Sequence, residues 1–224
     1  MGLKVVITGS TGMVGRGVLL ECLENEKVEK IVVVNRFSIE MEHPKLVEVI
    51  HADFFDLWTI EHYFDDADAC FFCLGVSSSG ISKENYIKVT HDLTLNFADS
   101  FIDVNPKSTF IYVSGEGTDS SEKKASHWAR VKGKTENELL SMPFQQAFMF
   151  RPGFIKPVRG EKSRTYLYNV IYVLIRPLYP LLKLLIPNKI TNTEKVGKAM
   201  INVVLKGFPT QILNTKAINE ASGI

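Results

Sequence analysis

Short apolar runs recur along the chain, and segments with helical periodicity separate them. Six of these runs predict β-strands, at residues 3–8, 31–35, 46–50, 69–74, 109–113 and 147–150. The runs are continuously apolar, which is typical of parallel strands buried on both faces of a sheet. Apolar residues at helical spacing predict helices over residues 12–24 and 83–104, and a final helix from Thr193. This alternation predicts an α/β fold with helices on both faces of a parallel sheet.

Composition narrows the class of protein further. A length of 224 residues, with 45% hydrophobic and 23% charged residues, suits one globular domain, which we expect to span residues 1–224. The formal net charge of +1 gives no reason to expect a nucleic acid as a partner. We also expect no metal site.

The three cysteines indicate a compartment in which thiols stay reduced, because their number is odd and small. The first residues lack the apolar stretch of a secretory signal, so we expect a cytoplasmic location. Cys70 and Cys73 form a CxxC pattern within a predicted strand, where their odd separation places the two sulfurs on opposite faces. We therefore interpret them as core cysteines and not as a redox pair.

A glycine loop of the form GxxGxxG follows the first predicted strand and opens the first helix. Gly9 permits a tight turn, Gly12 lets the backbone approach a pyrophosphate, and Gly15 lets the helix pack closely on the strand. The helix N-terminus then faces the negative charge. This context predicts a doubly wound Rossmann domain whose dinucleotide-binding loop consists of Gly9, Ser10, Thr11, Gly12, Met13, Val14 and Gly15. The alternative is a structural turn that binds nothing.

Residues at the ends of the next strands indicate which dinucleotide binds. Arg36 follows the second strand, where an NAD-specific site usually presents a carboxylate to the ribose 2′-hydroxyl. A guanidinium suits a 2′-phosphate, so NADP(H) is favoured over NAD(H); a solvated surface arginine is the alternative. Asp53 and Phe54, after the third strand, are predicted to contact the adenine, although Asp53 would also suit the cap of a following helix. Leu74 and Gly75 complete the predicted cofactor site.

Two later motifs, IYVS at residues 111–114 and RPGFIKP at residues 151–157, extend the pattern. With the glycine loop, they resemble the short-chain dehydrogenase/reductase superfamily in its atypical and extended branches, over residues 3–205. The best match is the group of small NAD(P)H-binding, epimerase-like proteins that includes Tat-interacting and NmrA-like regulators. This group contains reductases and members that sense the cofactor without turnover. The resemblance implies that Ser114 lies in the active site and that Pro152, Gly153 and Phe154 lie near the nicotinamide.

Catalytic members of the superfamily carry a tyrosine and a lysine four residues apart on one helix, so that both side chains reach the same site. The tyrosine exchanges the proton that accompanies hydride transfer, and the lysine lowers its pKa and holds the ribose. Lys132 matches the lysine, but Trp128 stands at the tyrosine position. An indole N–H donates a hydrogen bond but does not exchange its proton at neutral pH. Ordinary ketone reduction is therefore in question.

Four other residues are candidate proton donors. His127 has a suitable pKa but lies five residues before Lys132, off the shared helical face. Tyr86, Tyr166 and Tyr168 are further candidates, but a core or surface role is favoured for each.

An apolar and basic segment, residues 166–187, follows the sixth strand. A transmembrane helix is not favoured for this segment, because it contains Arg176, Lys183 and several prolines. Residues 156–198 hold nine basic and two acidic residues, a net charge of +7, which leaves −6 on the rest of the chain. Three interpretations stay open: a substrate-side region or lid over residues 155–192, as the resemblance implies; a homo-oligomer or partner surface; and peripheral membrane contact.

The sequence thus favours an NADP(H)-binding oxidoreductase or epimerase-like protein acting on a small, apolar carbonyl substrate. Ser114 would bind the carbonyl and Lys132 would hold the ribose. The alternative, motivated by Trp128, is a non-catalytic NADP(H) sensor or scaffold. A third option is that the fold binds no cofactor.

Overall fold

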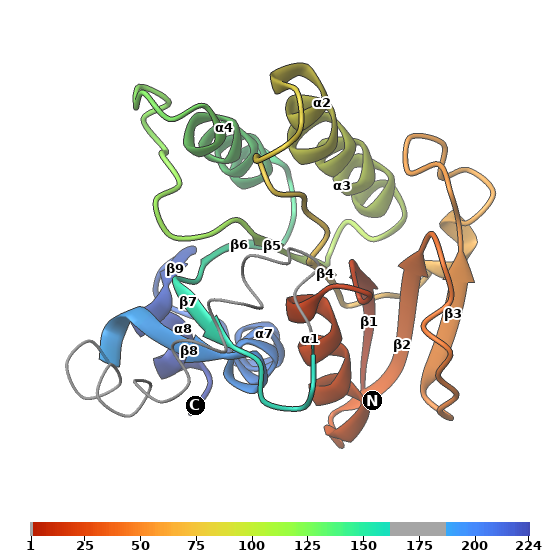
Figure 1. Ribbon diagram of the computed structural model, residues 1–224. Helices are drawn as coiled ribbons and strands as arrows, with labels where there is room; N and C mark the ends of the chain where they lie inside the picture. The colour runs from red at the N-terminus through yellow and green to blue at the C-terminus, as the bar shows by residue number, and fades with distance from the viewer. Residues whose placement is uncertain (1, 162–186) are drawn as a thin grey trace.

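A seven-stranded parallel sheet forms the centre of the protein, of which the computed structural model describes residues 2–161 and 187–224 (Figure 1). All six strand pairs are parallel, in the order β3-β2-β1-β4-β5-β6-β9. The strands are β1 (Leu3–Thr8), β2 (Val28–Asn35), β3 (Leu46–Ile50), β4 (Ala69–Phe72), β5 (Thr109–Val113), β6 (Gln146–Arg151) and β9 (Ile212–Asn214). This order confirms the predicted doubly wound Rossmann architecture.

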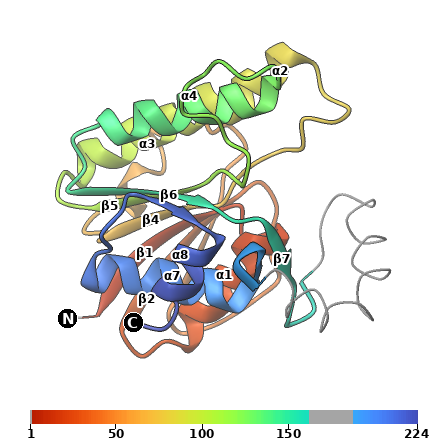
Figure 2. The ribbon, with the colours of Figure 1, turned by 90° about the vertical axis from the view of Figure 1, so that its left-hand side faces the viewer.

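Helices cover both faces of the sheet (Figures 1 and 2). One face carries α1 (Met13–Glu24), α7 (Thr193–Lys206) and α8 (Thr215–Ala221), and the other carries α2 (Lys83–Ile87), α3 (Leu93–Val104) and α4 (His127–Ser141). The last two helices of the chain each start at an asparagine cap, because Asn192 accepts a hydrogen bond from Lys195 N, and Asn214 accepts one from Ala217 N. Short 3-10 turns lie at η1 (Glu61–Tyr63) and η4 (Pro187–Lys189).

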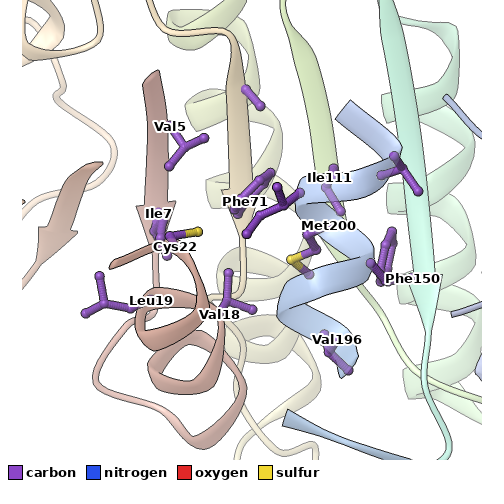
Figure 3. Close-up of a cluster of buried hydrophobic side chains, with 14 of the residues drawn as sticks. Val5, Ile7, Val18, Leu19, Cys22, Phe71, Ile111, Phe150, Val196 and Met200 are labelled. Atoms are coloured by element: carbon purple, nitrogen blue, oxygen red, sulfur yellow. The ribbon is translucent and has the colours of Figure 1, made fainter. Parts of the chain in front are cut away.

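The apolar core has two parts, one on each face of the sheet. Under α1 and α7, side chains such as Val18, Cys22 and Met200 pack against Phe71 and Ile111 of the strands (Figure 3). A second cluster, rich in phenylalanine, fills the space between the sheet and α3 and α4. The strands are therefore buried on both sides, which explains why their sequences are continuously apolar.

Most predicted elements are present with small changes of boundary. The strands at 3–8, 46–50 and 109–113 are confirmed, β2 begins earlier at Val28, and Gly12 is the cap of α1. The fourth strand ends at Phe72 and not at the predicted residue 74, and the backbone of Cys73 lies close to Gly9. The predicted helix over residues 83–104 contains a π-helical segment, η2 (Lys88–Asp92), between α2 and α3.

The CxxC cysteines lie on opposite faces of the sheet, as predicted. Cys70 belongs to the cluster under α3 and α4, and Cys73 packs against the cluster under α1 and α7. Both are free thiols, and burial raises the pKa of Cys73 to about 12. Neither thiol is therefore poised as a thiolate nucleophile.

A small two-stranded sheet, β7 (Phe154–Lys156) with β8 (Ile190–Asn192), brings together the two ends of the predicted substrate-side region, residues 155–192. Most of the segment 166–187 lies outside the described residues, so its three interpretations stay predictions. Across residues 2–161 and 187–224, no helix is both long and apolar enough to cross a membrane.

Candidate functional site

A cavity of about 280 Å³ opens at the carboxyl ends of β1, β2 and β4. The chain proceeds from β1 toward β2 and β3 on one side and returns to β4 on the other, so this is the point at which the strand order reverses. Ligands of open α/β sheets bind at such switch points. Eight of the predicted cofactor residues line the cavity, namely Gly9, Thr11, Gly12, Arg36, Asp53, Phe54, Leu74 and Gly75.

The glycine loop forms the floor of this cavity. Gly9 has a φ of +71°, and a Cβ there would lie 2.7 Å from the backbone of Cys73. A Cβ at Gly15 would overlap the carbonyl oxygen of Gly9, so the close packing predicted for Gly15 is present. Gly12 caps α1 without a side-chain hydrogen bond, which leaves the first amides of the helix available to an anion. Met13 and Val14 instead pack against the core.

The loop that carries Arg36 is held by polar contacts, one of them buried. Ser10 donates its hydroxyl to Asn35 at 2.9 Å, so it supports the loop from behind and does not line the cavity. Glu48 of β3 accepts hydrogen bonds from the Ser38 hydroxyl at 2.6 Å and from Ile39 N at 2.8 Å. The Arg36 side chain is exposed and has no hydrogen bond or ion pair to any residue within 2–161 and 187–224.

The cavity wall formed by the residues after β3 exposes different aromatic rings from the one that the sequence predicted. The Phe54 ring is only 3% exposed and stacks on Phe97 at 6.1 Å, so most of it belongs to the core. Two exposed rings that the sequence reading missed, Phe37 and Phe55, also line the cavity. Asp53 accepts a hydrogen bond from Phe55 N at 2.9 Å within a turn. No helix begins there in the described chain, so the capping alternative for Asp53 is wrong.

The π-helical segment contributes to the opposite wall. Val89 of η2 and Leu93 at the start of α3 line the cavity together with Leu74 and Gly75. These apolar side chains leave Arg36 and Asp53 as the charged groups of the lining. The cavity therefore combines apolar walls, a backbone cradle and one free cation among the described residues.

The predicted catalytic residues lie together at the ends of β5 and β6, but outside this cavity. Trp128, Lys132 and Glu136 follow one another at four-residue spacing on α4 and so share a face. The six-membered ring of Trp128 would lie 3.1 Å from a Cβ at Gly117, in the loop after β5. Lys132 Nζ donates a hydrogen bond to the carbonyl oxygen of Ser114.

A buried ionic network surrounds Ser114. Glu136 has no exposed surface, and its carboxylate accepts hydrogen bonds from the Ser114 hydroxyl and from Arg151, whose Nε lies 3.0 Å from both oxygens. Arg151 also donates to the hydroxyl of Ser120. Ser114 itself is only 5% exposed. The Ser114 hydroxyl therefore donates its hydrogen bond to a carboxylate of the protein. This weakens the prediction that Ser114 polarises a substrate carbonyl.

Burial changes the protonation of Lys132. Desolvation lowers the pKa of this amine to about 8, and the nearby charge of Glu136 opposes the change. The amine is thus close to its titration midpoint near neutral pH.

Two hydrogen bonds and a close contact with Glu116 hold the turn after β6. Gly153 N donates to the Thr215 hydroxyl at 2.8 Å, and Glu116 N donates to the carbonyl oxygen of Pro152 at 2.9 Å. A Cβ at Gly153 would overlap the carboxylate of Glu116, which is itself paired with Lys189. Phe154 starts β7 directly after this turn. Pro152, Gly153 and Phe154 therefore lie near the loop after β5, and their nicotinamide contact stays a prediction.

The proposed substitutes for tyrosine are placed elsewhere. Tyr86 is 2% exposed, and its ring centroid lies 6.0 Å from that of His127. His127 lines a separate cavity that shares no residue with the first. Tyr166 and Tyr168 lie outside the described residues.

Glu136 is a further site residue that the sequence patterns did not predict. Its spacing of four residues after Lys132 was the available signal, since this places it on the same helical face.

Sequence comparison identifies related proteins over most of the chain. The mitochondrial protein FMP52 of Meyerozyma guilliermondii is 25% identical over 214 residues, which cover 91% of this chain and 86% of that protein. Protein HTATIP2 of Rattus norvegicus is 24% identical over 161 residues, covering 70% and 65% of the two chains.

Solved structures share the fold at low sequence identity. A short chain dehydrogenase family protein from Francisella tularensis superposes with a TM-score of 0.68 at 13% identity, covering 99% of this chain and 100% of its own. A short chain dehydrogenase from Burkholderia cenocepacia, in complex with NADP, has a TM-score of 0.66 at 14% identity, with 98% and 90% coverage. The Bordetella bronchiseptica enzyme WbmG, in complex with NAD, has a TM-score of 0.69 at 12% identity, with 96% and 72% coverage.

A family model decides the classification. The model described as the NAD dependent epimerase/dehydratase family matches residues 5–126, which include the glycine loop and every residue that lines the cavity. The resemblance to short-chain dehydrogenases that the motifs indicated is thereby confirmed. This protein belongs to the NAD dependent epimerase/dehydratase family, whose members bind a nucleotide cofactor.

Proposed function

We propose that this protein binds NADP(H), with the adenosine half in the 280 Å³ cavity, and uses it as an oxidoreductase or epimerase-like enzyme on a small, apolar carbonyl compound. The observation that carries the proposal is Arg36, an exposed guanidinium at the cavity with no partner among the described residues. Family membership supports the class of cofactor. The class of substrate rests on the sequence pattern alone.

The residues of the cavity suit a dinucleotide. The amides of the glycine loop and of the α1 N-terminus would bind the pyrophosphate. Arg36 would bind a 2′-phosphate through paired hydrogen bonds, and Phe37 and Phe55 would contact the adenine ring. Structural relatives carry NADP in one case and NAD in another, so the preference for NADP(H) depends on Arg36.

The end of the sheet at β5 and β6 would receive the nicotinamide. When bound, this group supplies or accepts a hydride. Lys132 would hold the ribose, and the rigid turn at Gly153 would border the ring. The ion pair of Glu136 with Arg151 would hold α4 against β6 at this end.

Consumption of NADPH with a panel of small aldehydes and ketones tests the proposal. Activity should be present in the native protein and should fall by about 100-fold in Lys132→Ala. Activity that Lys132→Ala leaves unchanged would contradict the assignment of this residue.

A second function is favoured by a specific observation. Trp128 occupies the tyrosine position, and the hydroxyl of Ser114 donates a hydrogen bond to Glu136. Both features suit a protein that binds NADP(H) and responds to it by associating with a partner, without turnover. The Trp128→Tyr variant distinguishes the enzyme from the non-catalytic sensor. If the native protein is inactive and this variant gains reductase activity, the sensor function is supported.

Partners and location are further proposals. We infer that residues 166–187 contact a membrane surface or a protein, including a second copy of this chain, because their sequence combines apolar, aromatic and basic residues. Flotation with anionic and with neutral vesicles tests the membrane case, and an absence of anionic preference contradicts it. The free cysteines suit a reducing compartment, for which we propose the cytoplasm. Because the fungal relative is named mitochondrial, fractionation should compare both compartments.

A further inference from the structure

Trp128 leaves the proposed enzyme without the residue that exchanges a proton, and the surrounding groups offer few replacements. Tyr86 and Tyr112 are each only 2% exposed, and burial raises the pKa of both hydroxyls. The hydroxyl of Ser114 donates a hydrogen bond to Glu136. Among the described groups at this end of α4, Lys132 remains as one that can exchange a proton near neutral pH.

The ammonium group of Lys132 has no counter-ion. Its Nζ donates to the carbonyl oxygen of Ser114, which is a neutral acceptor. Within the described ranges, no carboxylate forms an ion pair with it. An ammonium that is half-buried against a neutral acceptor is destabilised relative to the free amine. This geometry agrees with the lowered pKa of about 8, whose main cause is burial.

Arg151 pairs with the carboxylate that lies one helical turn from Lys132. Glu136 lies one helical turn after Lys132 and would be its natural counter-ion. However, Arg151 donates to both carboxylate oxygens, and the Ser114 hydroxyl adds a further hydrogen bond. Because a carboxylate that is saturated by a bidentate guanidinium has little capacity left, Glu136 stays oriented toward β6.

A second ion pair lies in the loop after β5. Glu116, in the loop after β5, pairs with Lys189, and both side chains are largely exposed. Among the described residues, Glu136 on its own helix is the charge that acts on Lys132, and Arg151 of β6 is paired with that carboxylate.

We propose that Lys132 is the proton donor of this site and that Arg151 is a positioning residue that keeps Lys132 unpaired by holding Glu136. The proposal rests on the oxidoreductase function proposed above. In the reductive direction, the carbonyl carbon gains a C–H bond by accepting hydride from the reduced cofactor, and the C=O π pair moves to oxygen. Lys132 breaks one N–H bond and gives that proton to the oxygen, which yields an alcohol and the oxidised cofactor. Water then reprotonates the neutral amine.

Lys132→Arg separates proton transfer from cofactor binding. A guanidinium keeps the positive charge and donates hydrogen bonds, but it does not lose its proton. Turnover of NADPH with small aldehydes should fall by about 100-fold, while the Kd for NADPH should change by no more than about threefold. Lys134→Arg is the matched control, because Lys134 is an exposed lysine two positions away that pairs with Glu138. It should leave both quantities unchanged.

Arg151→Met gives a readout that a purely structural role would not change. It frees Glu136 to face Lys132, so the pKa of the amine should rise by about one unit. Reductive turnover needs the ammonium form and should fall as pH rises through about 8 in the native protein. The midpoint of that fall should lie about one pH unit higher in the variant.

Competitive labelling of lysines with acetic anhydride, resolved by peptide mass spectrometry, completes the test without requiring turnover. In the native protein, Lys132 should reach half-maximal reactivity near pH 8, and the pH midpoint of turnover should coincide with it. A midpoint near about pH 10.4, as for an unperturbed lysine, would overturn the proposal. Turnover that survives Lys132→Arg would overturn the proton-donor role and leave the oxidoreductase function standing. Labelling near pH 8 with NADPH bound, but no turnover of any aldehyde, would overturn both.

Discussion

Arg151 and Glu136 form an ion pair in which the guanidinium Nε lies 3.0 Å from each carboxylate oxygen. Glu136 has no exposed surface, and the side chain of Arg151 is 19% exposed. The pair joins α4 to the end of β6, and the hydroxyl of Ser114 connects β5 to the same carboxylate. One side chain therefore links three elements at the predicted catalytic end.

Removal of this carboxylate should strongly destabilise the fold. Glu136→Ala leaves the charge of Arg151 uncompensated, so the free energy of unfolding should fall by about 3–5 kcal/mol. Urea denaturation measures the change. Glu220→Ala is the control, because it removes an exposed i,i+4 pair with Lys216 on α8 and should cost less than about 0.5 kcal/mol. Equal effects of the two variants would contradict the structural role of Glu136.

A methyl group added at Gly15 should also destabilise the protein. The new Cβ would overlap the carbonyl oxygen of Gly9, so α1 would have to move away from the loop. Overpacking of this kind costs about 1–3 kcal/mol, and the shift should weaken NADPH binding as well. Gly75→Ala is the matched control for thermal denaturation, since a Cβ there meets nothing within 4 Å. A Gly15→Ala variant as stable as Gly75→Ala would show that the loop is not tightly packed.

Acid should remove a stabilising contribution of Asp119. Hydrogen bonds from Ser121 and from the backbone of Lys124 lower the pKa of this carboxyl to about 2. Because the pKa is lower in the folded state, its stabilising contribution is complete above about pH 4 and is lost as pH falls toward 2. Asp119→Asn should flatten the pH dependence of stability in this window. Asp65→Asn, at an exposed position, should not, and an identical acid profile for both variants would argue against this assignment.

Arg36 should determine the choice between the two dinucleotides. Arg36→Ala removes the charge-assisted hydrogen bonds expected with the 2′-phosphate, worth about 1.5–3 kcal/mol. NADPH affinity should therefore fall by about 10- to 100-fold, while NADH affinity should be nearly unchanged. Fluorescence titration with each cofactor measures this. A parallel loss for both cofactors would assign Arg36 to a contact that the two share.

Local patterns were sufficient to predict much of this structure. The continuous apolar runs predict the central strands, because strands covered on both faces have no polar side. The glycine loop is readable because its constraints arise within a few residues, as the overlap between Gly15 and Gly9 illustrates. By contrast, β9 has only three residues and no periodicity, and it exists because β6 offers a free edge.

The features that the sequence did not predict depend on contacts between residues that are far apart along the chain, or on the geometry of turns. The partnership of Glu136 with Arg151 requires α4 to pack beside β6, which spacing along the chain does not specify. A difference of one residue in a turn decides which of Phe54 and Phe55 is buried in the core and which is exposed at the cavity, and turns lack the periodicity that would predict it.

Isothermal titration of the native protein with NADPH and with NADH tests the central claim most directly. If the cavity is an NADP(H) site, NADPH should bind with a stoichiometry of about one per chain and about 10-fold or more tightly than NADH, since a charge-assisted contact is worth at least 1.4 kcal/mol. Tighter binding of NADH would contradict the role given to Arg36. An absence of heat with either cofactor would contradict the assignment of the cavity itself.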